Sequence, residues 1–281
     1  MRVIPVPSAL GGLYAEVARG PEALFSAGFL DACPDAIREA PVPPPAGPRL
    51  PALGLLCRSL ARRVAQTLIS GALPLVVGGD HAIAAGTWRG VGSALGHPPG
   101  LVWLDAHLDA HTPESTPSGN PHGMPLAALL GQGGPELAEV PGPALDPRHV
   151  CIVGARSFEA SELALLRRLG VRIFGMAEIR RRGLGEVFAE ALAIAAEGGR
   201  EFGLSIDLDV IDPAEAPGVE TPARGGLAAG ELLPLLAGLG RLPACRAIEL
   251  AEYHPGHDHD GRTAAIALAL VGALFGKAAE V

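Results

Sequence analysis

The strongest constraint on the fold is an alternation of short apolar runs with longer amphipathic segments. Several runs are apolar almost throughout, which is typical of strands covered by helices on both faces. The predicted strands are Arg2–Val6, Leu73–Val77, Leu101–Leu104, His149–Val153, Val171–Phe174, Gly203–Ile206 and Ala247–Leu250. The predicted helices between them are Gly54–Ile69, Ile83–Leu95, Ser161–Leu169, Gly185–Ala196, Ala229–Leu239 and Thr263–Phe275. This alternation predicts an α/β protein with a mainly parallel sheet between two helical layers.

Composition narrows the class of protein. The chain has 281 residues, 48% of them hydrophobic, which suits one large α/β domain spanning 1–281, with Pro41–Pro51 as a surface loop. A net charge of −8 and the lack of a long basic run argue against nucleic acid as a partner. The four scattered cysteines, and the lack of a signal peptide or a membrane-length apolar run, predict a cytoplasmic protein with no membrane partner.

Four predicted strands end in side chains of the kind that bind metals. The most informative segment is Asp105-Ala106-His107-Leu108-Asp109, because alternate residues share one face of an extended backbone. The other strand ends carry His81, the pair Asp207 and Asp209, and Glu252. Ligands of open α/β sheets gather beyond the carboxyl ends of the strands. We therefore expect these side chains to converge at one edge of the sheet.

The number of ligands favours two metal ions. Six of these side chains are counted as ligands: the imidazoles of His81 and His107 and the carboxylates of Asp105, Asp109, Asp207 and Asp209. They are too many for one ion, whereas two ions can share bridging carboxylates. Four carboxylates also balance two divalent cations and leave room for a bridging hydroxide. With no thiolate in the set, manganese(II) is the natural candidate, with cobalt, nickel or iron as alternatives. A dinuclear site of this kind activates water, so the predicted chemistry is hydrolysis.

Each piece taken alone has a simpler explanation. His81 could be a core or helix-capping histidine, and Gly78-Gly79 could be only a tight turn. Asp207 and Asp209 could cap a turn, and Glu252 could be half of a buried ion pair. The metal hypothesis is favoured because the alternative requires several unpaired carboxylates to gather at one sheet edge.

Three long motifs resemble those of the arginase/ureohydrolase family, closest to the arginase branch. They are GGDHAIAAGT, DAHLDAHTPESTPSGNPHGMP and SIDLDVIDPAEAPGVETPARGGL, followed by Glu252. The resemblance covers nearly the whole chain. It implies a three-layer α/β/α fold with a parallel sheet of about eight strands, two manganese(II) ions per chain and a homotrimer or homohexamer. The implied reaction is hydrolysis of a guanidino C–N bond, which releases urea and an amine.

The resemblance also implies a role for each site residue. His81 and Asp109 would bind one metal, His107 and Asp209 the other, and Asp105 and Asp207 would bridge them. His122 would shuttle protons, Glu252 would pair with the substrate guanidinium, and Thr221 would help to hold it. The catalytic residues expected on this basis are His122, Asp109 and Glu252.

The substrate's far end is less well specified. Ser118 and Asn120 match positions that receive an α-carboxylate in arginases, which favours arginine over agmatine. His111 stands where arginases usually have Asn, and Glu159 stands where an Asp usually contacts the α-amino group. A change of one methylene can redirect specificity. The alternatives to arginine are therefore agmatine, guanidinobutyrate, hydroxyarginine or a related guanidino compound.

Two other classes of protein and one further site compete with this interpretation. A deacetylase-like hydrolase would use a single zinc, and a ligand sensor would keep the fold without activity. The complete ligand set argues against both. The loop Tyr253–Asp260 carries several potential ligands, but its Pro and Gly favour an exposed loop, with Asp260 as a cap of the last helix.

Overall fold

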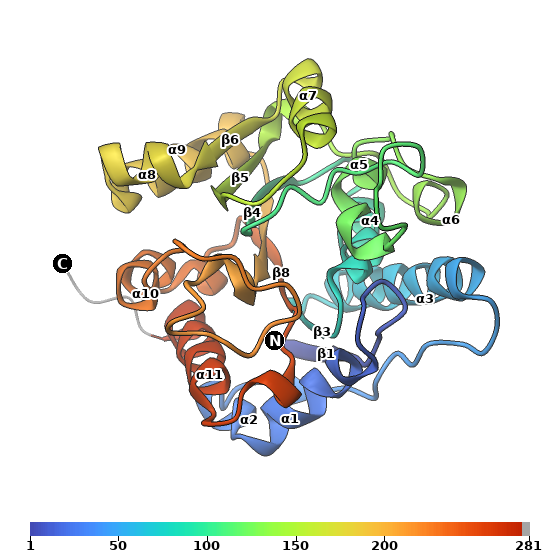
Figure 1. Ribbon diagram of the computed structural model, residues 1–281. Coiled ribbons are helices and arrows are strands. Elements are labelled where there is room, and N and C mark those ends of the chain that lie inside the picture. Colours follow the sequence, from blue (N-terminus) through green and yellow to red (C-terminus); the bar gives the residue numbers. More distant parts are fainter. Residues whose placement is uncertain (277–281) are drawn as a thin grey trace.

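A computed structural model describes residues 1–276 and shows one sheet between helices (Figure 1). All eight strands are parallel, in the order β2-β1-β3-β8-β7-β4-β5-β6. The strands are β1 Arg2–Val6, β2 Ile37–Arg38, β3 Pro74–Gly78, β4 Gly100–Leu104, β5 Val150–Ala155, β6 Arg172–Gly175, β7 Phe202–Asp207 and β8 Cys245–Ala251. The predicted three-layer α/β/α class is confirmed. The predicted domain of 1–281 includes residues 277–281, which lie outside the described residues.

Eleven α-helices are described, and they cover both faces of the sheet (Figure 1). They are α1 Gly20–Ser26, α2 Phe29–Ala32, α3 Arg49–Ile69, α4 Ala84–Leu95, α5 Pro125–Leu129, α6 Pro135–Ala138, α7 Ala160–Leu169, α8 Met176–Arg182, α9 Leu184–Ala195, α10 Ala229–Leu236 and α11 Arg262–Phe275. Helices α3, α4 and α5 pack on one face, and α9, α10 and α11 pack on the other. None of the described helices has the length and apolar character needed to cross a membrane.

Alternation along the central strands divides the core between the two faces. In β4, Leu101 and Trp103 enter the cluster under α3 and α4, whereas Val102 and Leu104 enter the cluster under α9 and α11. All four side chains are fully buried. A parallel strand covered on both faces needs apolar residues at every position, which is why these strands are continuous apolar runs.

Some predicted boundaries are wrong, for local reasons. Helix α3 begins at Arg49 rather than Gly54, because Pro51 lies in its first turn, where a missing N–H costs no hydrogen bond. The proline-rich loop therefore ends at residue 48. Helix α10 stops at Leu236 instead of Leu239, and Gly238 follows in the left-handed conformation. The two-residue edge strand β2 has no apolar run to reveal it, since both residues are exposed.

Candidate active site

Four neighbouring strands at the centre of the sheet lead to the predicted metal ligands and to the predicted substrate contact Glu252 at their carboxyl ends. β3, β8, β7 and β4 lie side by side in this order. β3 leads to His81, β8 to Glu252, β7 to the Asp207–Asp209 turn, and β4 to the segment 105–109. The residues that the sequence places far apart are therefore brought to one edge of the sheet.

Three carboxylates surround the imidazole of His81. Its Nδ1 atom lies 3.1 Å from Asp109 Oδ2, 3.3 Å from Asp105 Oδ2 and 3.3 Å from Asp207 Oδ2. The histidine is buried, and Nδ1 has no hydrogen-bond partner among residues 1–276. A buried nitrogen that faces three carboxylate oxygens without a hydrogen bond is arranged as a metal ligand.

A second cluster lies beside the first and shares Asp105. His107 Nδ1 is 2.9 Å from Asp209 Oδ2 and 3.5 Å from Asp105 Oδ1. Asp105 thus directs one oxygen toward each histidine, as a bridging carboxylate must. Within the described residues, His81 with Asp105 and Asp109 forms one group compact enough to hold a single ion, and His107 with Asp105 and Asp209 forms another.

Neighbouring side chains fix the orientation of the ligands. His81 Nε2 lies 2.9 Å from the hydroxyl of Ser205, which donates to Glu249 Oε1 at 2.8 Å. Because Ser205 gives its only proton to Glu249, its oxygen accepts from Nε2–H, and Nδ1 keeps its lone pair for a metal. Trp103 Nε1 donates to Asp105 Oδ2 at 2.7 Å.

The charges of the cluster fit two divalent cations. Burial raises the pKa of Asp207 well above its ordinary range, and the neighbouring Asp209 and Asp105 add to this rise. Burial also acts to lower the pKa of His81, but Asp105, Asp109 and Asp207 outweigh it and raise that pKa well above its ordinary value. Without metal, protons on the imidazoles take the place of the missing positive charge. Two divalent ions bound by these O and N donors would displace those protons and balance the four carboxylates.

Two site residues adopt strained backbone conformations. Asp109 has a φ of 47° and Glu252 a φ of 68°, the two positive φ values among described residues other than glycine. A left-handed conformation is costly for residues with a Cβ, so the surrounding fold must hold these two in place. In this conformation Asp109 and Glu252 direct their carboxylates into the site, which an extended backbone at a strand end would not do.

A cavity of about 240 Å³ opens beside the predicted metal ligands. Its wall includes Glu252, whose Oε1 accepts from the backbone N–H of His81 at 2.8 Å, while Oε2 is buried without a hydrogen bond inside residues 1–276. Burial raises the pKa of Glu252 to about 7 despite the nearby His122. The carboxylate sits 3.4 Å from His122 Nδ1. Thr221 also lines the cavity, and its hydroxyl donates to Asp209 at 3.4 Å.

The far end of the cavity holds His111 and two glutamates. His111 Nε2 lies 2.9 Å from Glu159 Oε2 and 3.3 Å from Glu162 Oε2, and all three residues line the cavity. Burial raises the pKa of Glu162 to about 8. The predicted contact Ser118 is at the wall as well. Asn120 is not among the lining residues; its side-chain oxygen accepts from Arg49 at 3.3 Å.

This chain is similar to known arginases in sequence and in fold. The model of the Arginase family matches residues 33–276. An arginase of Bacillus caldovelox is 38% identical over 220 residues, which are 78% of this chain and 73% of that protein. Its native structure at pH 5.6 superposes with a TM-score of 0.92 at 37% identity, covering 98% of both chains. The Entamoeba histolytica arginase solved in complex with L-ornithine gives a TM-score of 0.91 at 29% identity, covering 98% of both chains.

The chain belongs to the arginase family. Members of this family are hydrolases that act on the C–N bonds of linear amidines, so the predicted reaction class is confirmed, and with it the arginase-like fold. The single-zinc deacetylase and the inactive sensor are not favoured. The assignment of individual residues to metal and substrate stays a prediction, and the short distances between their side chains are compatible with it.

Within this arginase-family site, the sequence analysis missed several residues. Glu162 follows Glu159 by three positions and completes a capping box at the start of α7. Glu249 is a buried carboxylate inside the apolar strand β8, a signal that was visible in the sequence. Glu220, next to Thr221, lies 3.3 Å from His122. Nothing in the sequence distinguishes Glu220 from a surface glutamate, because only the fold of its loop buries it.

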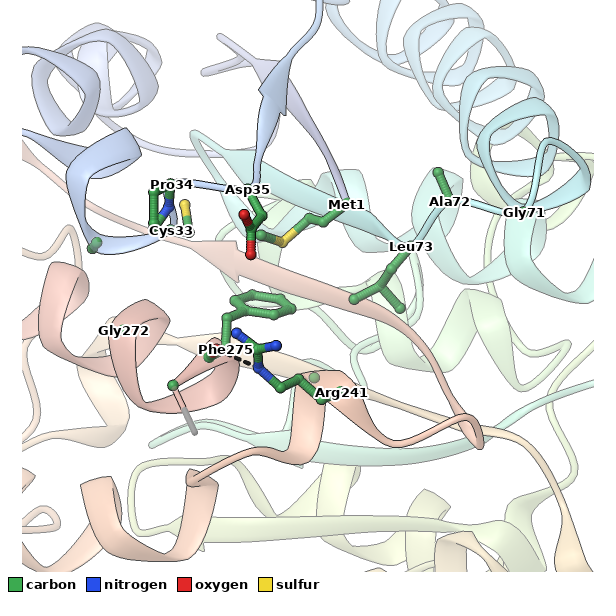
Figure 2. Close-up of a pocket in the computed structure, with 13 residues that line it drawn as sticks. Met1, Cys33, Pro34, Asp35, Gly71, Ala72, Leu73, Arg241, Gly272 and Phe275 are labelled. Atoms are coloured by element: carbon green, nitrogen blue, oxygen red, sulfur yellow. Dashed lines mark hydrogen bonds between the residues drawn. The ribbon is translucent and has the colours of Figure 1, made fainter. Parts of the chain in front are cut away.

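Two other regions turn out not to resemble a metal site. In the loop Tyr253–Asp260, the carboxylate of Asp258 accepts from the backbone N–H groups of Thr263 and Ala264 in the first turn of α11. Asp258 therefore caps this helix, and the prediction that Asp260 does so was wrong. Asp260 instead pairs with Arg262 at the surface. A hollow of about 520 Å³ lies beside the amino ends of β1 and β3. Figure 2 shows its lining, in which Arg241 donates to the Phe275 carbonyl. Within residues 1–276, four groups of His, Asp and Glu side chains are compact enough to hold a metal ion, and none of them lies in either region.

Proposed function

We propose that this protein is an arginase, which hydrolyses arginine to ornithine and urea with two manganese(II) ions. The observation that carries the proposal is Asp105, which directs one oxygen toward His81 and the other toward His107. A carboxylate shared in this way supports a dinuclear centre rather than a single ion. His81, Asp109 and Asp207 would hold one ion and His107 and Asp209 the other, with Asp207 also available as a second bridge.

Bound there, the two ions would supply a water molecule activated as a nucleophile at neutral pH. The donor atoms are carboxylate oxygens and imidazole nitrogens without a thiolate, which supports manganese, with cobalt, nickel or iron as substitutes.

Glu252 is suited to the cationic end of the substrate. Its Oε2 atom is buried and without a hydrogen bond among residues 1–276, so a guanidinium N–H arriving in the cavity finds an acceptor that nothing else uses. Charge-assisted hydrogen bonds of this kind are among the strongest in proteins. Thr221, on the same wall, adds a hydroxyl.

His122 is suited to proton transfer. The carboxylates of Glu252, Asp109 and Glu220 outweigh burial and raise the pKa of His122 to about 9, so the imidazole holds a proton at neutral pH. When the guanidino C–N bond breaks, the departing amine nitrogen needs a proton, and His122 can donate it. Glu252, which lies beside His122, would bind the guanidinium and so orient the substrate for this proton transfer.

The far end of the cavity favours an amino-acid substrate. Glu159 offers negative charge to an α-ammonium group, with the carboxyl group of Glu162 as a further acceptor, and Ser118 offers a hydroxyl to an α-carboxylate. The arginase of Entamoeba histolytica was solved with L-ornithine, which carries both groups. His111 lies 2.9 Å from Glu159 and already satisfies part of that charge. Hydrolysis of another guanidino compound, such as guanidinobutyrate, hydroxyarginine or agmatine, is therefore the alternative that the experiment must test.

The decisive experiment is a urea-release screen of the manganese-loaded protein. The substrates are arginine, agmatine, guanidinobutyrate and hydroxyarginine at equal concentration, with the chelated protein as a control. We expect the highest kcat/KM for arginine and loss of activity after chelation, restored by manganese. Preference for a substrate without the α-amino group would support this alternative, and no urea from any of them would contradict both.

A cytoplasmic location and a homotrimeric or homohexameric state are further parts of the proposal. They rest on the family alone. Sedimentation of the purified protein tests the assembly directly.

A further inference from the structure

Glu220 is a buried carboxylate for which the proposed reaction has no use. Its side chain is completely shielded from solvent. One oxygen, Oε1, accepts from the backbone N–H groups of Leu13 at 2.9 Å and Tyr14 at 2.7 Å. The other, Oε2, lies 3.3 Å from Nδ1 of His122 and makes no hydrogen bond within residues 1–276. A buried carboxylate with one unpaired oxygen is costly, so we expect that oxygen to have an interaction partner.

The loop after β1 is built around this carboxylate. A Cβ at Gly12 would lie 2.4 Å from Glu220 Oε2, so only glycine leaves room for the carboxylate. The neighbouring Gly11 carbonyl accepts from the backbone N–H of His122 at 3.1 Å. The same loop therefore holds Glu220 by one oxygen and His122 by its backbone, and it fixes their separation.

His122 Nδ1 has two carboxylate neighbours at nearly equal distance. Glu220 Oε2 is 3.3 Å away and Glu252 Oε1 is 3.4 Å away. Glu252 is also the proposed partner of the substrate's cation and already accepts from the His81 backbone. A carboxylate shared among a substrate, a backbone amide and an imidazole can hold each of them only weakly. Glu220 has no such competing task toward the cavity, whose lining does not include it.

We propose that Glu220 is a positioning residue that holds the His122 imidazole through Nδ1 while Glu252 turns to the substrate. The inference rests on the proposed function, in which His122 donates a proton to the leaving amine. With Nδ1 held by Glu220, Nε2 is the nitrogen left to exchange a proton with the cleft. Four carboxylates act on His122 from the elements packed around it: Glu252 after β8, Glu220 in the loop after β7, Asp109 after β4 and Asp80 after β3.

The test compares Glu220→Gln with the matched control Glu215→Gln. Glu215 lies in the same loop and also accepts a backbone N–H, from Ala229, but it is not among the carboxylates that act on His122. The glutamine at 220 can still accept from Leu13 and Tyr14 but loses the charge on the other side. We expect kcat for urea release to fall about 10- to 100-fold with KM nearly unchanged. The alkaline limb of the kcat–pH profile should move about one unit lower, because the imidazole loses its proton more easily. Glu215→Gln should match the wild type.

A second variant and a second measurement keep the test informative if Glu220→Gln does not fold or if the protein shows no activity. Gly12→Ala keeps Glu220 but places a methyl against its carboxylate, and should reproduce both changes. In the metal-free protein, NMR of ¹³C-labelled histidine rings reports the titration of His122 directly, with His122→Asn identifying its signal. We expect Glu220→Gln to lower that midpoint by about one pH unit.

The outcomes separate this inference from the proposed function. An active wild type whose kcat, pH profile and His122 titration survive Glu220→Gln unchanged would overturn the role of Glu220 alone. An inactive wild type would overturn the proposed function, and the NMR titration would then decide whether Glu220 holds His122.

Discussion

Removal of the Ser205 hydroxyl should weaken metal binding although Ser205 is not itself a predicted ligand. The hydroxyl lies between His81 Nε2 at 2.9 Å and Glu249 Oε1 at 2.8 Å, and all three residues are buried. This contact orients the imidazole of His81 so that Nδ1 faces the carboxylates, where it can bind a metal once its proton is displaced. Ser205→Ala removes one oxygen and leaves both neighbours in place.

The magnitude follows from the two contacts. A buried polar group that loses its partner costs about 1–3 kcal/mol. His81 Nε2 loses its acceptor, whereas Glu249 keeps a hydrogen bond from Thr87. The penalty should therefore fall mainly on the histidine. Loss of such a supporting contact lowers metal affinity about 10- to 100-fold, which corresponds to about 1.4–2.7 kcal/mol. The two ranges agree.

The assay is calorimetric titration of the metal-free protein with manganese, with urea unfolding as a measure of stability. Ser93→Ala is the matched control, because the Ser93 hydroxyl also donates to a single acceptor, the Pro141 carbonyl, but at the surface. We expect one of the two manganese sites to weaken in Ser205→Ala and neither in the control. Unchanged affinity at both sites would refute the argument that Ser205 sets the tautomer of His81.

Three further predictions concern other parts of the site. His107→Ala or Asp209→Ala should remove bound manganese and urea release together, because each takes away half of the 2.9 Å pair; metal analysis that still found two ions per chain would contradict this. The pKa of His122 is raised to about 9 in the folded protein, so its protonated imidazole should stabilise the metal-free fold. This contribution should be complete below about pH 6.5 and lost as the pH rises through about 9. Urea unfolding of wild type and His122→Asn should then show a difference that shrinks from pH 6 to pH 10, and a constant difference would rule the effect out. His111→Ala should change kcat/KM for arginine by about 10-fold or more while changing that for agmatine little, since His111 contacts Glu159 and Glu162 at the far end; equal changes for both would place His111 outside substrate recognition.

The proposed metal ligands are visible in the sequence because they come soon after buried strands. A strand such as Leu101–Leu104 has no polar residue, so the abrupt change to Asp105-Ala106-His107-Leu108-Asp109 stands out in the sequence. The supporting residues gave weaker signals. Ser205 is an ordinary small residue in β7, and Glu162 is indistinguishable from a helix-capping glutamate.

The sequence by itself determined the class of fold and the family and indicated the proposed ligand set, because apolar periodicity and residue type are local properties. Only the tertiary structure decided the order β3-β8-β7-β4, which puts the four strand ends that lead to proposed site residues side by side. It alone also placed Glu220 against His122, across 98 positions of chain. Such contacts depend on how separate loops close over the sheet, and the packing that closes them is a property of the whole fold rather than of any one segment.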